Sequence, residues 1–137
     1  MKKKIAILGS TGSIGKTLFK IINKNKNNFE ITLLAANKNY KDIIKQAKLF
    51  KVKNLILTNK KAFLLTKNIL KNTNINVFDN FESMKKIFKY KKNDYVMSAI
   101  SGYEGLRPTL NIIKFTKKIV IANKESIICG WSLIKKE

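Results

Sequence analysis

The chain has no histidine among its 137 residues, a single cysteine and only eight acidic residues. Without histidine it lacks the side chain that proteins use most often as a metal ligand and as an acid–base group near neutral pH. The acids show none of the clustered spacing that a hard cation such as Mg²⁺ needs, so no metal site is predicted. Cys129 has no partner for an internal disulfide, which fits a reducing cytoplasm. We expect its thiol to be a small buried hydrophobic group rather than a reactive nucleophile.

Long hydrophobic runs are absent too, although 45% of the residues are hydrophobic. No apolar run approaches the ~20 residues that cross a bilayer. The first apolar run begins at Ile5, which leaves no room before it for a signal or transit peptide. We therefore predict one globular domain in the cytoplasm, with no membrane partner.

The shortage of acids leaves a net charge of +21, which is typical of proteins that bind nucleic acid. However, Arg107 is the only arginine among the 29 basic residues, and specific nucleic-acid contacts favour the guanidinium fork of arginine. The lysines are spread along the whole chain, and lysine, asparagine and isoleucine, all abundant here, share A/T-rich codons. We predict no specific nucleic-acid partner, only a salt-sensitive attraction to polyanions in general.

Strand-like and helix-like segments alternate along the chain. Strands are predicted at Lys4–Leu8, Phe29–Ala36, Asn54–Leu57, Ile75–Phe78, Tyr95–Ile100 and Ile119–Ala122, with Ile75–Phe78 at an edge and the last two buried. Helices are predicted at Ile14–Asn25, Lys41–Phe50, Ala62–Lys71, Phe81–Phe88, Leu106–Phe115 and Glu125–Ile134. The alternation predicts an α/β fold whose mostly parallel sheet carries helices on both faces. Because crossovers are right-handed, a Rossmann-like, doubly wound sheet is the favoured topology.

The segment between the first strand and the first helix reads Gly9-Ser10-Thr11-Gly12-Ser13-Ile14-Gly15. A strand, a glycine turn and a helix in this order direct free backbone N–H groups and the positive end of the helix dipole to one point, which suits a phosphate. Gly9 permits the sharp exit from the strand, Gly12 lets the backbone approach a pyrophosphate, and Gly15 lets the helix pack against the sheet. This G-x-x-G-x-x-G spacing predicts a dinucleotide site.

The end of the second strand bears on which dinucleotide is bound, because ligands of this fold lie at the carboxyl ends of the strands. An NAD-selective domain usually carries an acid there, whereas this chain has Asn37-Lys38-Asn39 and its next acid is Asp42. A cation beside amides suits a 2′-phosphate, so NADP is preferred to NAD. The alternative is an ordinary polar turn in a lysine-rich protein.

Two later strand ends also carry candidate residues. Small residues from Ser98 to Gly102, Ala99 among them, would let a cofactor lie against the backbone. The alternative is an ordinary glycine turn that joins the strand to the next helix. Asn123 and Glu125 suit a helix N-terminus, as a cap and as a first-turn acid. Between them, Lys124 would direct a cation to the place where nicotinamide and substrate meet.

Taken together, these segments resemble the 1-deoxy-D-xylulose 5-phosphate reductoisomerase family. The resemblance rests on GSTGSIG, on Lys38-Asn39, on Ala99-Ile100-x-Gly102-x-x-Gly105-Leu106-x-Pro108-Thr109, and on Ala122-Asn123-Lys124-Glu125-Ser126, in that order over essentially the whole chain. The glycine motif alone is shared with other NADP enzymes, such as semialdehyde dehydrogenases. The last stretch is far more specific.

The resemblance implies a role for each matching position. Thr11, Gly12, Ser13 and Ile14 would hold the NADPH pyrophosphate, and Asn37, Lys38 and Asn39 the 2′-phosphate region. Asn123 and Glu125 match cofactor-site residues, and Lys124 matches the substrate-contacting lysine. The family usually has glycine where Asn37 stands. Asparagine tolerates left-handed backbone angles, so we expect the turn to survive the change, with a side chain added where the cofactor approaches.

The family rearranges 1-deoxy-D-xylulose 5-phosphate on a divalent cation and then reduces it with NADPH to 2-C-methyl-D-erythritol 4-phosphate, in non-mevalonate isoprenoid biosynthesis. The resemblance implies that residues 1–137 are its N-terminal NADPH-binding domain, without the catalytic and C-terminal domains that would hold Mg²⁺ or Mn²⁺. We therefore expect these residues alone to be inactive, and the full-length bacterial enzyme to be a homodimer. Alternatives are a fragment of another NADP oxidoreductase, a free-standing NADP-binding module, and a basic nucleic-acid binder.

Overall fold

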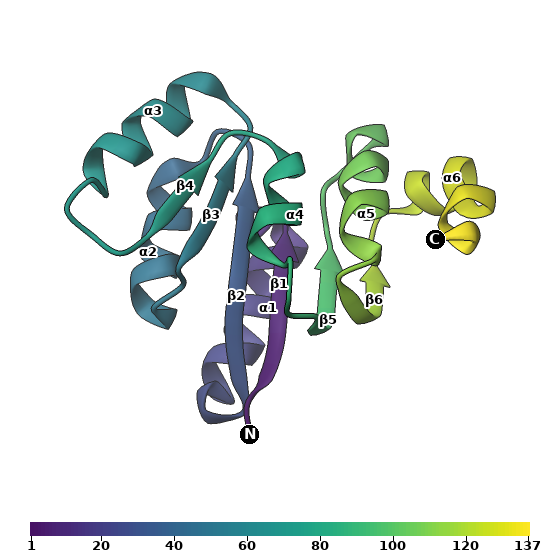
Figure 1. The fold of residues 1–137 in the computed structure, drawn as a ribbon, viewed down its shortest axis with the longest axis horizontal. Coiled ribbons are helices and arrows are strands. Elements are labelled where there is room, and N and C mark those ends of the chain that lie inside the picture. The colour runs from purple at the N-terminus through teal and green to yellow at the C-terminus, as the bar shows by residue number, and fades with distance from the viewer.

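The computed structural model describes residues 1–137, which form a single sheet of six parallel strands in the order β4-β3-β2-β1-β5-β6. The strands are β1 (Lys3–Leu8), β2 (Phe29–Ala36), β3 (Asn54–Leu57), β4 (Asn76–Phe78), β5 (Asn93–Ser98) and β6 (Thr116–Ile121). The helices are α1 (Ser13–Lys24), α2 (Tyr40–Phe50), α3 (Lys60–Ile69), α4 (Met84–Ile87), α5 (Leu106–Ile113) and α6 (Lys124–Lys136). Short 3₁₀ turns occupy Lys26–Asn28, Phe81–Ser83 and Tyr103–Gly105. The doubly wound, Rossmann-like sheet expected from the alternation is confirmed (Figure 1).

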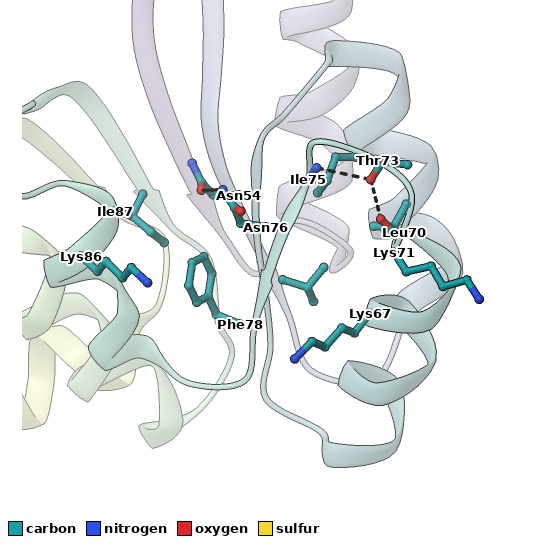
Figure 2. Close-up of a pocket in the computed structure, with 11 residues that line it drawn as sticks. Asn54, Lys67, Leu70, Lys71, Thr73, Ile75, Asn76, Phe78, Lys86 and Ile87 are labelled. Carbon is teal, nitrogen blue, oxygen red and sulfur yellow. Dashed lines mark hydrogen bonds between the residues drawn. The ribbon is translucent and has the colours of Figure 1, made fainter.

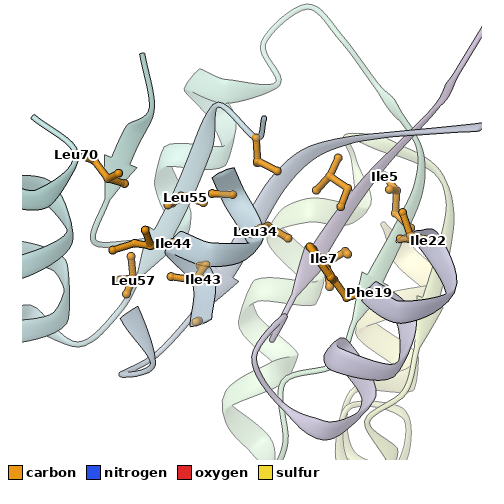
Figure 3. Packing of buried hydrophobic residues seen from close by; sticks show 14 of the residues in the cluster. Ile5, Ile7, Phe19, Ile22, Leu34, Ile43, Ile44, Leu55, Leu57 and Leu70 are labelled. Carbon is orange, nitrogen blue, oxygen red and sulfur yellow. The ribbon is translucent and has the colours of Figure 1, made fainter. Parts of the chain in front are cut away.

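Two hydrophobic clusters cover the two faces of the sheet, because successive residues of a strand point to opposite sides. On one face, Leu34 and Ala36 of β2 join side chains of α1, α2 and α3. Figure 3 shows Phe19 and Ile22 of α1 packed there beside β1. On the other face, Leu33 and Ala35 of β2 join side chains of α4 and α5. Each fully buried leucine or isoleucine contributes about 1.5–3 kcal/mol through burial alone, so both layers stabilise the sheet.

On the α1 face the covering thins out beyond β1. Tyr95 and Met97 of β5 are only partly buried against the α1 cluster, and with Leu18 and Val120 of β6 they lie around a shallow apolar depression of 280 Å³. The prediction that Ile119–Ala122 is a buried strand was therefore wrong: β6 is an edge strand packed on its α5 side only, and Val120 is exposed.

The last helix, α6, packs beside α5, and Gly130 lets it approach the side chain of Leu106 (Figure 1). Its remaining sides are open, so Ile128 and Trp131 are 76% and 52% exposed. Cys129 is exposed for the same reason, which corrects the expectation of a buried thiol. None of the helices combines the length and the apolar character that a membrane crossing requires.

The predicted helix at Phe81–Phe88 is also shorter than expected. A 3₁₀ turn occupies its first three residues, and only Met84–Ile87 is α-helical. Pro108 lies in the first turn of α5, as predicted, where its missing N–H costs nothing.

Candidate functional site

A cavity of 430 Å³ opens at the carboxyl ends of β1, β2, β3 and β5. Strands β2 to β4 lie on one side of β1, and β5 and β6 lie on the other, so the loops that leave β1 and β5 diverge there. The lining consists of Gly9, Thr11, Gly12, Ala36, Asn37, Thr58, Phe81, Ala99, Ile100, Ser101 and Glu104.

Two glycines of the turn between β1 and α1 are required by the fold itself. Gly9 has φ +79°, and a Cβ there would lie 2.6 Å from the carbonyl oxygen of Ala99. A Cβ on Gly15 would overlap the carbonyl of Gly9 and lie 2.7 Å from Cα of Ser10. Backbone is packed against both positions, so a side chain at either one would displace the turn.

Gly12 differs from the other two glycines. Its backbone is extended (φ −76°, ψ 173°), and the nearest heavy atom to an added Cβ would be the Gly9 oxygen at 3.5 Å, an ordinary contact. The fold would accept a side chain here, but that side chain would occupy the cavity that Gly12 lines. The missing side chain therefore leaves room for a ligand.

Gly12 is also the N-cap of α1, and this helix begins with neither a side-chain cap nor an acid in its first turn. In contrast, the side chains of Asn39, Asn59 and Asn123 cap α2, α3 and α6. The first N–H groups of an uncapped helix, together with the positive end of its dipole, are suited to binding an anion.

Gln46 of α2 holds the glycine turn in place. Its Nε2 donates to the carbonyl of Ser10 at 3.0 Å, and its side chain is buried among inward-facing residues of α2. The N–H groups of Gly9 and Ser10 donate to the carbonyl of Ala35 at 2.9 and 3.0 Å. Sequence reasoning did not identify Gln46. The available signal was a polar residue on the apolar face of a helix.

The ends of β2 and β3 remain paired after the strands stop. The N–H of Thr58 donates to the carbonyl of Ala36 at 3.2 Å, and the N–H of Asn59 donates to that of Asn37 at 3.3 Å. The Thr58 hydroxyl donates to Oδ1 of Asn37, also at 3.2 Å. These bonds place Asn37 and Thr58 side by side on the cavity wall.

Asp42, the first acid after β2, is paired within the protein. Nζ of Lys16 lies 2.9 Å from its Oδ2, and Nδ2 of Asn39 donates to the same oxygen at 2.9 Å. The hydrogen bond from Lys16, followed by that from Asn39, holds the pKa of Asp42 below its usual range. The negative charge of Asp42, in the region that follows β2, is therefore balanced by the positive charge of Lys16.

Asn123 joins the loop after β5 to the start of α6. Its Oδ1 accepts from the N–H of Ser126 at 2.7 Å, and its Nδ2 donates to the carbonyls of Ile100 and Gly102. This confirms Asn123 as the cap of α6. Its side chain is buried and uses both amide hydrogens within the protein, so it supports the loop that lines the cavity.

The cavity brings together only some of the predicted site residues. Gly9, Thr11, Gly12, Asn37 and Ala99 line it, whereas Ser13, Ile14, Lys38, Asn39, Asn123, Lys124 and Glu125 do not. Ser13 and Ile14 begin α1, and Lys38 and Asn39 directly follow Asn37. Thr58 and Phe81 were missed, although the rule about strand ends, applied to β3 and β4 as well, would have found both.

A second cavity, of 620 Å³, lies at the free edge of β4 (Figure 2). Lys67 of α3 and Lys86 of α4 approach it from the two faces of the sheet. Its amides, Asn54 and Asn76, come from the first residues of β3 and β4. It has no glycine turn, no helix N-terminus and no junction of diverging loops, so the cavity beside Gly12 is the better candidate site despite its smaller volume.

The parallel sheet, its strand order and the glycine turn at the point where that order reverses define a Rossmann-like α/β domain. Residues 5–130 match the sequence model of 1-deoxy-D-xylulose 5-phosphate reductoisomerase, and the chain belongs to that family.

Relatives of that description occur in several bacteria. The chain is 63% identical to the reductoisomerase of Pelagibacter ubique over 136 residues, which cover 98% of this chain and 35% of that protein. It is 40% identical to that of Buchnera aphidicola over 136 residues, covering 97% of this chain and 34% of the relative. The chain thus spans about a third of the length of the curated relatives that it matches.

Solved structures agree with the fold. The reductoisomerase of Zymomonas mobilis in complex with NADPH superposes with a TM-score of 0.88 at 27% identity, covering 99% of this chain and 36% of that one. A reductoisomerase in complex with NADPH, fosmidomycin and magnesium gives a TM-score of 0.87 at 26% identity, covering 98% of this chain and 33% of that one.

Proposed function

We propose that this chain binds NADPH in the cavity beside Gly12, as the dinucleotide-binding domain, residues 1–137, of a reductoisomerase. The single observation that carries the proposal is Gly12 itself, whose missing side chain leaves open the cavity wall at the uncapped N-terminus of α1. A pyrophosphate fits there, because it offers only hydrogen-bond acceptors and carries negative charge. The reductoisomerase structures with NADPH support this choice of ligand.

The cofactor would extend to both sides of that point. Thr11, Gly12, Ser13 and Ile14 bind its pyrophosphate at the start of α1. On one side, Asn37, Lys38 and Asn39 surround the adenosine 2′-phosphate at the end of β2. On the other, Ala99 and the loop after it support the nicotinamide half, next to Gly9, and the loop is held in turn by Asn123. Lys124, exposed at the start of α6, contacts the substrate, and Glu125 follows it on the cofactor side of the site.

Conversion of 1-deoxy-D-xylulose 5-phosphate to 2-C-methyl-D-erythritol 4-phosphate, in the cytoplasm, is the activity of the whole enzyme under this proposal. NADPH supplies the hydride in that reaction. A divalent cation is also implied, but no group of three or more carboxylate or thiol side chains in this chain could hold one. We assign the Mg²⁺ or Mn²⁺ site, and the homodimer contact, to residues that the longer relatives have beyond the matched third.

Calorimetry with NADPH and with NADH tests the proposal. We expect NADPH to bind more tightly, because the end of β2 offers a cation and amides to the 2′-phosphate. Lys38→Glu should reduce the preference by about 1–2 kcal/mol, the scale of a charge-assisted contact. Lys135→Glu, the same charge change in the last turn of α6, is the matched control. Equal affinities would remove the 2′-phosphate assignment, and a chain that binds neither nucleotide would overturn the whole proposal.

A further inference from the structure

The carboxamide of Asn37 is oriented by a hydrogen bond from Thr58, the residue that follows β3. Thr58 has a hydroxyl that donates to Oδ1 of Asn37 at 3.2 Å, and the backbone bonds from Thr58 to Ala36 and from Asn59 to Asn37 keep the two segments together. Both side chains line the same cavity. The oxygen of the amide is therefore engaged, and its NH₂ group is the end that remains for a ligand.

A side chain that presents an NH₂ group to the ligand discriminates between dinucleotides. A phosphate ester offers only acceptor oxygens, whereas a ribose 2′-hydroxyl both donates and accepts, and an acid is its usual partner in NAD-selective domains. We infer that Thr58 is a positioning residue that makes Asn37 a hydrogen-bond donor to the 2′-phosphate of NADPH. The inference rests on the proposed function and deepens it, because it assigns part of the cofactor preference to a residue pair outside the glycine turn.

The charges around the pair favour the same ligand. Lys38 directly follows Asn37, and Asp42, the nearest acid along the chain, is paired with Lys16 and Asn39. Glu104 also lines the cavity, but it comes from the turn after β5, and β1 separates β5 from β2 in the sheet. An anion beside Asn37 thus meets an amide donor next to Lys38 in the chain, and the charge of Asp42 is already balanced by Lys16.

Four variants test the role of Thr58, each titrated with NADPH, NADH, adenosine 2′,5′-bisphosphate and 5′-AMP. Thr58→Val keeps the shape but removes the hydroxyl, so the amide is free to turn its oxygen toward the ligand. We expect a loss of about three- to tenfold for the two 2′-phosphate ligands, the net scale of one ordinary hydrogen bond, and a change of less than about twofold for NADH and 5′-AMP. Thr58→Ser should restore the wild-type ratio of affinities.

Asn37→Asp keeps the acceptor for Thr58 but replaces the donor with a carboxylate. It should cost more than about tenfold for NADPH and leave NADH binding equal or stronger. Thr73→Val is the control, because the Thr73 hydroxyl donates to the Leu70 carbonyl at 2.7 Å, beside the other cavity (Figure 2). It should change no affinity.

The outcomes separate this inference from the proposed function. If the wild-type chain prefers NADPH and Thr58→Val retains the full preference, Thr58 has no such role and the proposed function stands. An equal loss for all four ligands would mean that Thr58 only supports the fold of the site, which also overturns the inference. Failure of the wild-type chain to bind any of the four ligands overturns both.

Discussion

Gly12 is the glycine of the turn at which the fold itself has room for a Cβ, so a substitution there tests the proposed pyrophosphate site. We predict that Gly12→Val still folds, at a cost of about 1 kcal/mol because valine is a poorer N-cap than glycine, but binds NADPH and NADH more weakly by the same factor, on the order of tenfold, or about 1.4 kcal/mol. Thermal unfolding and calorimetry on the same preparation measure the two effects. Gly15→Ala is the matched control, because its Cβ would collide with backbone of Gly9 and Ser10 and should lower stability first. Unchanged binding in folded Gly12→Val would place the pyrophosphate elsewhere.

Asp42 is a single side chain whose contribution to stability depends on pH. Its pKa is lowered in the folded protein, chiefly by the hydrogen bond from Lys16, so the stabilisation is complete above the ordinary value of 3.8 and is lost as the pH falls through the lower, folded value. Lys16→Met should therefore raise the pKa of Asp42 toward its ordinary value, with little effect on stability at neutral pH, because the pair is exposed.

Titration of the side-chain carboxyl groups by NMR measures that change. Asp94 is the internal control. Its pKa is lowered by Lys117 and by the backbone N–H of Lys4, on other elements, and should not move in Lys16→Met. If Asp42 titrates identically in both proteins, the ion pair does not form in solution, and the acid beyond β2 is not neutralised as described.

Among the elements, those with clear borders in the sequence were predicted best. The predicted strand Phe29–Ala36 matches β2, because apolar residues run from a polar turn to Asn37. The start of β6 was missed because Lys117 and Lys118 are typical of a loop. An edge strand tolerates them, and here Lys117 pairs with Asp94 at 2.9 Å and Lys118 lies over the ring of Tyr95. Such partners come from other strands, so local composition could not reveal them.

Asn123 shows how one side chain can join two elements, and Asn123→Ala should destabilise the protein more than the loss of a helix cap alone. The variant removes the cap of α6 and also leaves the carbonyls of Ile100 and Gly102 without their donor. We expect a cost of about 2–3 kcal/mol, combining a lost cap with lost buried hydrogen bonds. Asn59→Ala, which removes only the cap of α3, should cost about 1 kcal/mol. Urea unfolding of both variants measures the two losses of stability. Equal losses would contradict the view that Asn123 joins the loop after β5 to α6.

For the whole molecule, alternation and right-handed crossovers were enough to predict the doubly wound sheet, but the details of the site depended on the order of the strands. Thr58 and Phe81 enter the cavity because β3 and β4 continue outward on the β2 side of β1. Gln46 holds the turn because α2 lies over it. The exposure of Cys129 and Val120 also follows from assembly, since no element covers those sides of α6 and β6. The rule about strand ends could have named Thr58 and Phe81 as candidates, but which strand ends share one cavity, and which side chains stay uncovered, follows only from the strand order.

The last prediction concerns catalysis by the 137 residues on their own. They provide a cavity suited to a dinucleotide and, at the start of α6, Lys124 as the proposed substrate contact, but they contain no histidine and no cluster of three potential metal ligands. Rearranging a carbon skeleton on a divalent cation requires such a cluster, together with an acid–base group over the substrate. We therefore expect no measurable oxidation of NADPH that depends on 1-deoxy-D-xylulose 5-phosphate, with or without Mg²⁺ or Mn²⁺, at concentrations where NADPH binding is saturated.

The remaining two-thirds of a related reductoisomerase, added as a separate polypeptide, should restore the reaction. Lys124→Ala should then impair substrate use while NADPH affinity and the melting temperature stay unchanged. Substrate-dependent oxidation by the 137 residues alone would show that the chain holds its own catalytic groups and would contradict the assignment of the metal site to the longer relatives.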